Sequence, residues 1–239
     1  MSEILWHDVL PSTMIEASRL AAEGAENGTV IAARSQTAGQ GRLGRDWYSD
    51  PGMGLYCTVI LRPRVDASDL PCVTLLTGLA VSEALTVVSG LSFDIRWPND
   101  ILWDGRKCCG ILARMEHGAV LAGIGVNLNQ REFPEGLRTP AVSLALATGR
   151  EFLAENVLDA ILPSLETHVR IFEEQGRDAV LRLFSNASSY VSGRKVAVDM
   201  DGGTIYGITD GLDESGFLRI QKEDGTRETV LAGSVRPRD

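Results

Sequence analysis

Cysteine is scarce in this sequence, and the few cysteines form no recognisable site. Cys57, Cys72, Cys108 and Cys109 make no Cys-x-x-Cys motif and have no histidine at the spacing of a zinc ligand. The N-terminal segment MSEILWHDVLPST lacks the basic residues and the apolar run of a signal peptide, and the apolar stretches stay short of the roughly 20 residues that cross a bilayer. We therefore expect a cytoplasmic protein with reduced thiols and no metal site.

Positive charge is also in short supply. Lysine and arginine number 23 against 32 aspartates and glutamates, which gives the 239-residue chain a net charge of −9. General nucleic-acid binders depend on neutralising phosphates, so this composition argues against that class. With 44% apolar residues, the chain is long enough to bury a core as one large domain or as one domain with a small module.

The sequence pattern changes once along the chain. Helix-like and strand-like segments alternate in the first part, and short alternating strands separated by Gly- and Asp-containing turns follow. Turns at roughly ten-residue spacing are typical of a small antiparallel barrel. We therefore predict a larger domain over residues 1–189 and a small β-barrel domain over residues 190–239.

The larger part mixes hairpins with helices, which favours an α+β fold with a mixed sheet over a doubly wound parallel sheet. Thr13 and Glu16 resemble a capping box that opens the first helix, and Pro163 predicts a kink in the last one. The predicted helices cover residues 13–23, 68–88 and 153–175, and the predicted strands cover residues 29–34, 54–63, 93–97, 107–115 and 119–128.

Residues 39–44, GQGRLG, match the Gly-x-Gly-x-x-Gly pattern of dinucleotide-binding proteins. That interpretation fails, because a turn-rich stretch with Pro51 follows where a helix should begin. Five arginines against two acidic residues between positions 34 and 64 make this segment locally positive. A glycine-rich loop with flanking arginines can bind an anion. Solvated arginines on a mobile surface loop explain the pattern equally well.

The second polar stretch is RWPNDILWDGRKCCGILAR, residues 96–114. Trp97 to Asp100 place polar groups at a rigid corner, and Lys107 leads into an apolar strand seven residues after Asp100. Such a lysine is either an edge residue whose stem lies along apolar surface or a cation placed for binding. Asn127, in the segment GIGVNLN, fits either a turn or a ligand contact.

Together these segments resemble the biotin protein ligases. Ser12-Thr13, SQTAGQGRLGRDW, GLYCTVILRP, RWPND, GRKCCGIL and GIGVNLN occur in the order and spacing of that family. The resemblance implies a catalytic domain akin to class II aminoacyl-tRNA synthetases, followed by an SH3-like barrel. It also implies an ATP-dependent ligase, which forms biotinyl-5′-adenylate and pyrophosphate from biotin and Mg²⁺-bound ATP. The biotin then passes to a lysine of a biotin carboxyl carrier protein.

The resemblance also implies roles for individual residues. Lys107 matches the catalytic lysine and Arg42 an arginine on the phosphate side, while Asp100 is the candidate for orienting the acceptor lysine or taking its proton. The expected biotin contacts are Ser12, Thr13, Gln36, Gly39, Gln40, Gly110 and Leu112. The expected contacts with ATP or the adenylate are Arg42, Arg45, Trp47, Asn99, Lys107, Asn127 and Arg238, and the spacing does not decide between Arg238 and Arg236.

Three residues depart from the family pattern. Met14 follows Ser-Thr where the family often has asparagine, and Gln40 and Leu43 replace cations of the glycine-rich loop. Phosphate binding would then depend on Arg42, Arg45 and Lys107.

A lipoate- or octanoate-transferring relative is the nearest alternative, and a non-catalytic module that binds biotin or the carrier is an alternative of another class. Lys107 and Arg42 argue against the non-catalytic module. Too few residues precede Ser12 for the helix-turn-helix of a ligase that is also a repressor, so we expect no DNA binding. The expected partners are biotin, ATP and the carrier domain of acetyl-CoA carboxylase or a related carboxylase, with no membrane. A homodimer is compatible with the sequence.

Overall fold

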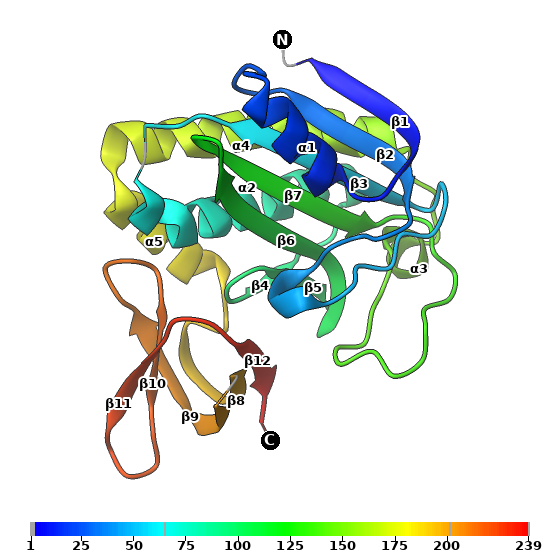
Figure 1. The fold of residues 1–239 in the computed structure, drawn as a ribbon. Helices are drawn as coiled ribbons and strands as arrows, with labels where there is room; N and C mark the ends of the chain where they lie inside the picture. The colour runs from blue at the N-terminus through cyan, green and yellow to red at the C-terminus, as the bar shows by residue number, and fades with distance from the viewer. Residues whose placement is uncertain (1–2, 65, 201, 239) are drawn as a thin grey trace.

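The computed structural model describes residues 3–64, 66–200 and 202–238, and it places the strands of the chain in two sheets (Figure 1). The larger sheet has seven strands in the order β1-β2-β3-β7-β6-β5-β4. Only β1 and β2 pair in parallel, and the other neighbours are antiparallel, so the predicted mixed sheet is confirmed. The strands are β1 (Ile4–Leu10), β2 (Val30–Gln36), β3 (Gly54–Leu61), β4 (Asp94–Arg96), β5 (Asp100–Trp103), β6 (Arg106–Glu116) and β7 (Ala119–Asn127).

Helices cover both faces of this sheet. Alternate residues of β2 belong to different apolar clusters, with Ile31 on the side of α1 (Thr13–Ala22) and Val30 and Ala32 on the opposite side. Because both faces are covered, the inner strand β3 is buried along its whole length. The opposite side holds the larger core, to which α2 (Leu70–Ser89), α3 (Leu144–Thr148), α4 (Ala154–Gln175) and α5 (Arg177–Ala187) contribute.

Helix α2 is long and apolar enough, by length and composition, to cross a membrane, and it is the one such helix in the part of the chain that the structure describes. The expectation that every apolar stretch is too short for a membrane is therefore wrong for this segment. Most of α2 is buried, including Leu75, Leu76 and Leu85, and it packs against α4, α5 and β6. This burial is that of a core helix.

Helix α1 begins one residue earlier than a cap at Thr13 would require. Ser12 is the N-cap, and its Oγ accepts a hydrogen bond from the Met14 N–H at 3.3 Å. Thr13 is the first helical residue, and its hydroxyl accepts a hydrogen bond from Thr58 Oγ1 at 2.9 Å instead of capping the helix. Both hydroxyls are buried at the end of α1 that faces the middle of the large sheet.

The smaller sheet is antiparallel and has the strand order β11-β10-β9-β8-β12. It belongs to an SH3-like C-terminal domain and lies below the large sheet in Figure 1. Trp97 Nε1 donates to the Gly216 carbonyl oxygen at 2.9 Å and joins the two parts. The strands are β8 (Ser192–Met200), β9 (Gly203–Leu212), β10 (Leu218–Gln221), β11 (Arg227–Val230) and β12 (Ser234–Pro237).

Candidate active site

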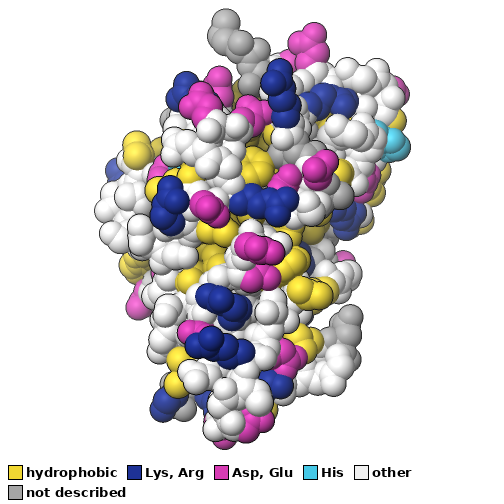
Figure 2. All heavy atoms as spheres, turned by 90° about the vertical axis from the view of Figure 1, so that its left-hand side faces the viewer, with side chains coloured by type: hydrophobic (Ala, Val, Ile, Leu, Met, Phe, Trp, Pro, Cys, Tyr) yellow, Lys and Arg dark blue, Asp and Glu magenta, His cyan; other side chains and the backbone are white. Residues whose placement is uncertain are grey.

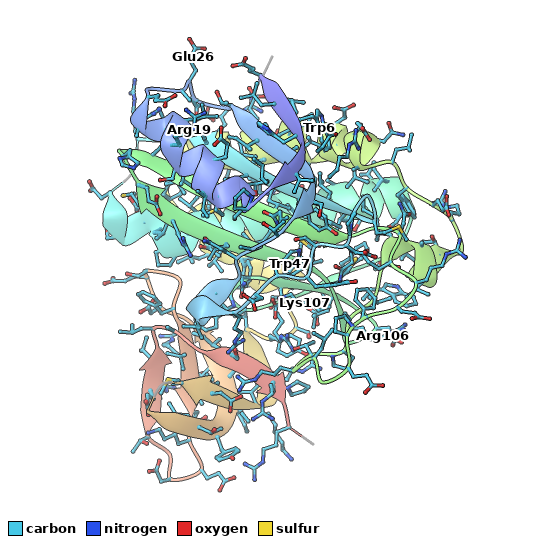
Figure 3. The ribbon with its side chains drawn as sticks, turned by 45° about the vertical axis from the view of Figure 1, so that its right-hand side comes forward. Trp6, Arg19, Glu26, Trp47, Arg106 and Lys107 are labelled. Carbon is cyan, nitrogen blue, oxygen red and sulfur yellow. The ribbon has the colours of Figure 1, made fainter. Side chains whose placement is uncertain are left out.

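Two adjoining cavities lie between the glycine-rich loop and the sheets. The smaller, of about 50 Å³, lies between the start of α1 and the strands β6 and β7. The larger, of about 200 Å³, extends to strand β12 of the C-terminal sheet. Five residues line both cavities and therefore mark their junction: Gly41, Arg42, Trp47, Asn99 and Lys107. Figure 3 shows Trp47 and Lys107 close together at this place.

Lys107 is held at the junction by its backbone and by its ammonium group. Its N–H donates to the Pro140 carbonyl oxygen at 2.7 Å, and its carbonyl oxygen accepts from the Val142 N–H at 3.0 Å. Its Nζ lies 2.5 Å from Asp100 Oδ1 and 5.2 Å from the centre of the Trp47 ring. The ammonium therefore has a fixed position between a carboxylate and an aromatic face.

Asp100 binds two cations at once. Its Oδ1 pairs with Lys107, and its Oδ2 accepts a hydrogen bond from Arg96 Nη2 at 2.6 Å. Burial alone would raise the pKa of the Asp100 carboxyl, but the positive charges of Lys107 and Arg96 outweigh it and hold the pKa below its ordinary value. A carboxylate with both oxygens paired and a lowered pKa is a weak proton acceptor, and it is well suited to orienting Lys107.

The glycine-rich loop folds back on itself over the junction. The Gly41 N–H donates to the Arg45 carbonyl oxygen at 2.7 Å, and the Trp47 N–H donates to the Gly39 carbonyl oxygen at 2.9 Å. At the turn, Leu43 has the left-handed backbone conformation (φ 57°) and is exposed.

Arg42, on this loop, donates from Nη1 to Asn99 Oδ1 at 3.1 Å. Burial is the main influence on the pKa of its guanidinium and lowers it. Among the described residues, no carboxylate lies within ion-pair distance of Arg42. A partly buried guanidinium whose partner is a neutral amide suits an anionic ligand at the junction.

The smaller cavity offers neutral hydrogen-bonding groups near the start of α1. Gln36 Oε1 accepts from the Thr13 N–H at 2.8 Å and from Thr13 Oγ1 at 3.3 Å, and Gln36 Nε2 donates to Ser49 Oγ at 2.9 Å. Ser12 and Thr13 add hydroxyls at the N-terminal end of α1, where the helix dipole is positive. This end suits a ligand with a polar carbonyl and N–H groups.

Glycines make the floor of the smaller cavity. Gly110 pairs with Gly125, and Leu112 pairs with Gly123 two residues further along the same face of β6 and β7. The Trp47 indole lies directly on this floor, because a methyl group added at Gly110 would lie 2.7 Å from Trp47 Cζ3, and one added at Gly125 would lie 2.6 Å from Trp47 Nε1. Met14 packs on Gly123 in the same way, with its Sδ 2.8 Å from an added methyl group.

Two buried polar atoms around this cavity have no hydrogen-bond partner among the described residues: Trp47 Nε1 and Gln40 Oε1. One is a donor and the other an acceptor, and both residues are in reach of the junction. Buried polar groups are normally paired, so these atoms fit a ligand that supplies both an acceptor and a donor.

The larger cavity is rich in arginine and is built by both domains. Asn127 lies in its wall, and its Nδ2 donates to the carbonyl oxygens of Lys107 and Val142 at 3.2 and 3.3 Å. Arg45 comes from the glycine-rich loop. The segment 133–141 contributes Arg138, and β12 contributes Arg236. These cations suit a polyanionic ligand.

The structure brings most of the predicted site residues together. Those that line one or both cavities are Ser12, Thr13, Gln36, Gln40, Arg42, Arg45, Trp47, Asn99, Asp100, Lys107, Gly110, Leu112 and Asn127. Gly39 lies beside them, where the loop passes so close that an added methyl group would be 2.6 Å from the Trp47 carbonyl oxygen. Arg238 lies elsewhere, at a surface groove of the C-terminal sheet, where it pairs with Glu223 at 3.1 Å.

Sequence reasoning missed several residues of the walls, namely Arg96, Gly123, Gly125, Arg138 and Thr139. The two glycines carried a usable signal, because they stand two apart in the strand-like segment GIGVNLN and so share one face. Arg138 lies in an irregular segment with no periodicity, and only the fold brings it to the cavity.

Known proteins are similar to almost the whole length of this chain. Residues 6–130 match the Biotin/lipoate A/B protein ligase family, and residues 191–236 match the Biotin protein ligase C terminal domain. The Bifunctional ligase/repressor BirA of Bacillus subtilis (strain 168) is 35% identical over 236 residues, which cover 96% of this chain and 72% of that protein. The Biotin--[acetyl-CoA-carboxylase] ligase of Mycobacterium tuberculosis is 32% identical over 238 residues, which cover 94% of this chain and 85% of that protein.

A solved structure is similar along the full length. The biotin protein ligase from Aquifex aeolicus in complex with biotin and ATP has a TM-score of 0.87 and 31% sequence identity, and the match covers 100% of both chains. The arrangement of the two sheets around the cavities is thus shared with a protein whose solved structure contains both small molecules.

Proposed function

The chain belongs to the Biotin/lipoate A/B protein ligase family, and we propose that its two cavities hold the two substrates of a biotin protein ligase, biotin in the smaller and ATP in the larger. The chain is a biotin ligase enzyme, since relatives of that activity cover almost all of it and the similar solved structure contains biotin and ATP. The lipoate alternative is not favoured by these relatives. The observation that carries the assignment of the cavities is their junction at Lys107 and Arg42.

The first step joins two anions. The biotin carboxylate attacks the α-phosphorus of ATP, the bond to the β-phosphate oxygen breaks, and biotinyl-5′-adenylate and pyrophosphate form. Repulsion opposes this approach, so cations fixed at the point of attack are the main source of catalysis. Lys107 and Arg42 stand at that point, and Asp100 keeps the Lys107 ammonium in place. Asn99 holds Arg42 through its Oδ1.

The second step transfers biotin to protein. The neutral amine of a carrier lysine attacks the carbonyl carbon of the mixed anhydride, an amide bond forms, and AMP leaves with the bonding electrons. The proton of the attacking amine passes to water or phosphate, because both oxygens of Asp100 are already paired. The acceptor that we propose is the carrier domain of acetyl-CoA carboxylase or a related carboxylase.

Magnesium is expected to arrive with ATP. The described residues contain no group of three or more His, Cys, Asp or Glu side chains that would hold a metal ion. Mg²⁺ is usually bound by substrate phosphates, water and one or two carboxylates, so such a cluster is not required. Asp46, exposed in the wall of the larger cavity, fits the role of that carboxylate. When bound, the ion would neutralise phosphate charge.

Transfer of labelled biotin to a purified carrier domain tests the function directly. We expect label on the carrier only when ATP and Mg²⁺ are present, with pyrophosphate released in the first step. A thermal-shift comparison of biotin with lipoate should show stabilisation by biotin. Carrier that stays unlabelled while the protein still binds biotin would favour the non-catalytic module.

The division into a catalytic domain, residues 1–189, and an SH3-like domain, residues 190–239, is supported by the second sheet, whose strands lie between residues 192 and 237.

We place the enzyme in the cytoplasm, where its carrier and ATP are found, and we expect no DNA binding. The net charge of −9 supports the expectation that the protein does not bind DNA. The face shown in Figure 2 supports it too, because Lys and Arg are mixed there with Asp and Glu. Sedimentation with and without biotin and ATP would reveal a homodimer.

A further inference from the structure

Asp199 joins arginines from both domains. It lies on β8 of the C-terminal sheet, where Arg236 of β12 donates to Asp199 Oδ2 from Nε at 2.8 Å and to Oδ1 from Nη2 at 2.9 Å. Arg138 of the catalytic domain lies with its Nη1 3.4 Å from the same Oδ2. Thr204 Oγ1 also donates a hydrogen bond to Asp199 Oδ1, at 2.9 Å.

Both arginines line the larger cavity, whereas Asp199 itself does not. Two guanidinium groups placed side by side repel each other, and a shared carboxylate between them offsets the repulsion. The hydrogen bonds from Arg236 are the largest influence on the pKa of Asp199 and lower it to about 2, so the carboxylate is ionised at neutral pH. The bidentate pair engages Nε and Nη2 of Arg236 and leaves its Nη1 hydrogens for another acceptor.

The cations of the larger cavity are not equivalent. Lys107 and Arg42 stand at the junction, where the α-phosphate must react. Arg96 is already engaged by Asp100 and by Thr139 Oγ1, to which it donates at 2.7 Å. The pyrophosphate group has to leave on the side away from the biotin cavity. Arg45, Arg138 and Arg236 line the larger cavity and not the smaller one, so they are the cations placed for that side. Of these three, Arg138 and Arg236 are the two that Asp199 joins.

We propose that Asp199 is a positioning residue, which holds Arg138 and Arg236 as a clamp between the two domains for the β- and γ-phosphates of ATP. The inference rests on the proposed function, because it assumes that ATP occupies the larger cavity. The clamp takes part in the first step of the reaction and not in the second, since biotinyl-5′-adenylate has no β- or γ-phosphate.

The test separates the two half-reactions in the full chain. The main variant is Asp199→Asn, which keeps the shape of the side chain and removes its charge, and Asp199→Glu is the rescue variant. The matched control is Asp210→Asn, which breaks the exposed ion pair of Asp210 with Arg227 (2.8 Å) in the same domain and away from both cavities. Arg238→Gln is a second control, on the arginine that pairs with Glu223 instead of Asp199.

For Asp199→Asn, we expect the KM for ATP in adenylate formation to rise about tenfold, the size of one lost charge-assisted hydrogen bond. The KM for biotin and the rate of transfer from purified biotinyl-5′-adenylate to the carrier should stay within twofold of the wild type. The KM for pyrophosphate in the reverse reaction should rise together with that for ATP. Asp199→Glu should restore part of the loss, and both controls should behave like the wild type.

An unchanged KM for ATP in Asp199→Asn would overturn the proposal. Equal losses in both half-reactions would also overturn it, because they would show that Asp199 only holds the domains together. Failure of the proposed function is a separate outcome, in which the wild-type protein itself forms no biotinyl-5′-adenylate from biotin and ATP.

Discussion

The two cavities on either side of Lys107 are built in different ways. The smaller is made by residues of the catalytic domain alone, from hydroxyls, an amide and a floor of glycines. The larger is closed by both domains, and arginines from four separate segments line it. A neutral bicyclic head group is selected by shape and by neutral hydrogen bonds, whereas a triphosphate is held by charge. Changes on the two sides should therefore affect different kinetic constants.

The strongest test removes the charge at the junction, which both sides need. Lys107→Gln keeps the polarity and roughly the length of the side chain. It removes the ammonium group that offsets the repulsion between the biotin carboxylate and the α-phosphate. We expect the rate of adenylate formation to fall at least ~10²-fold, as for the loss of one preorganised electrostatic donor. Single-turnover measurement of pyrophosphate release checks this.

Lys222→Gln is the matched control, because Lys222 pairs with Glu228 on the C-terminal sheet, away from both cavities. A Lys107→Gln rate within a few-fold of the wild type would make Lys107 an edge residue of its strand and nothing more.

The second test changes Gly125, which lines the smaller cavity and not the larger one. In Gly125→Ala, the new methyl group would overlap the Trp47 indole, which must then leave the glycine floor. We expect the KM for biotin to rise about tenfold, since a displaced wall loses its packing against the ligand, while the KM for ATP changes much less.

Gly78→Ala is the control for this variant, because the nearest atom to an added methyl group at Gly78 is 3.7 Å away, an ordinary contact. Equal rises of both KM values in Gly125→Ala would mean that the two sides are not as separate as the structure indicates.

The difference between the cavities also explains what the sequence could predict. The smaller cavity and the junction lie largely on short motifs such as SQTAGQGRLGRDW and GRKCCGIL, and most of their polar residues were predicted, whereas the floor glycines Gly123 and Gly125 were not. The helix over Leu70–Ser89 and the strand over Gly54–Leu61 were predicted because their patterns are apolar and long. Strands β1, β5 and β12 and helices α3 and α5 were not predicted. The edge strand β1 carries His7 and Asp8, which interrupt its apolar pattern, and β5 has only four residues.

The larger cavity was harder to predict, because its residues are far apart in the chain. Arg138 and Asp199 are joined only once the C-terminal sheet has docked, and no local pattern encodes that docking. The sequence pattern could not choose between Arg236 and Arg238, because residues two apart in an extended segment share a face. The structure places Arg236, on β12, at the cavity and Arg238, just beyond the end of β12, at the surface groove.

The third test concerns the loop that covers both cavities. Ordering the backbone costs roughly 1–2 kcal/mol per residue, and the glycines and charged residues of 39–46 bury little apolar surface to offset it. We expect this loop to move in the free enzyme and to become ordered over biotin and the adenylate, which keeps water from the mixed anhydride.

Trypsin reports this directly, because it cleaves after Arg42 and Arg45. Cleavage there should slow severalfold when biotin and ATP are added together, and less with either alone, since one ligand fills only one side. Cleavage after Arg19, in helix α1, is the internal control. Equal loop cleavage with and without the ligands would show that the loop does not act as a lid.

The smallest expected effect is the dependence of stability on pH at the arginine-rich side. The pKa of Asp199 is lowered to about 2 in the folded protein, against an ordinary value near 3.9. Because the folded state lowers this pKa, the ionised carboxylate contributes stability above pH ~3.9, and the contribution is lost as the pH falls toward 2. The difference in Tm between the wild type and Asp199→Asn should therefore be equal at pH 7 and pH 5 and should shrink below pH 4. Calorimetry at these pH values measures it, and a difference that already shrinks between pH 7 and pH 5 would show that the arginines do not hold this carboxylate in its ionised form.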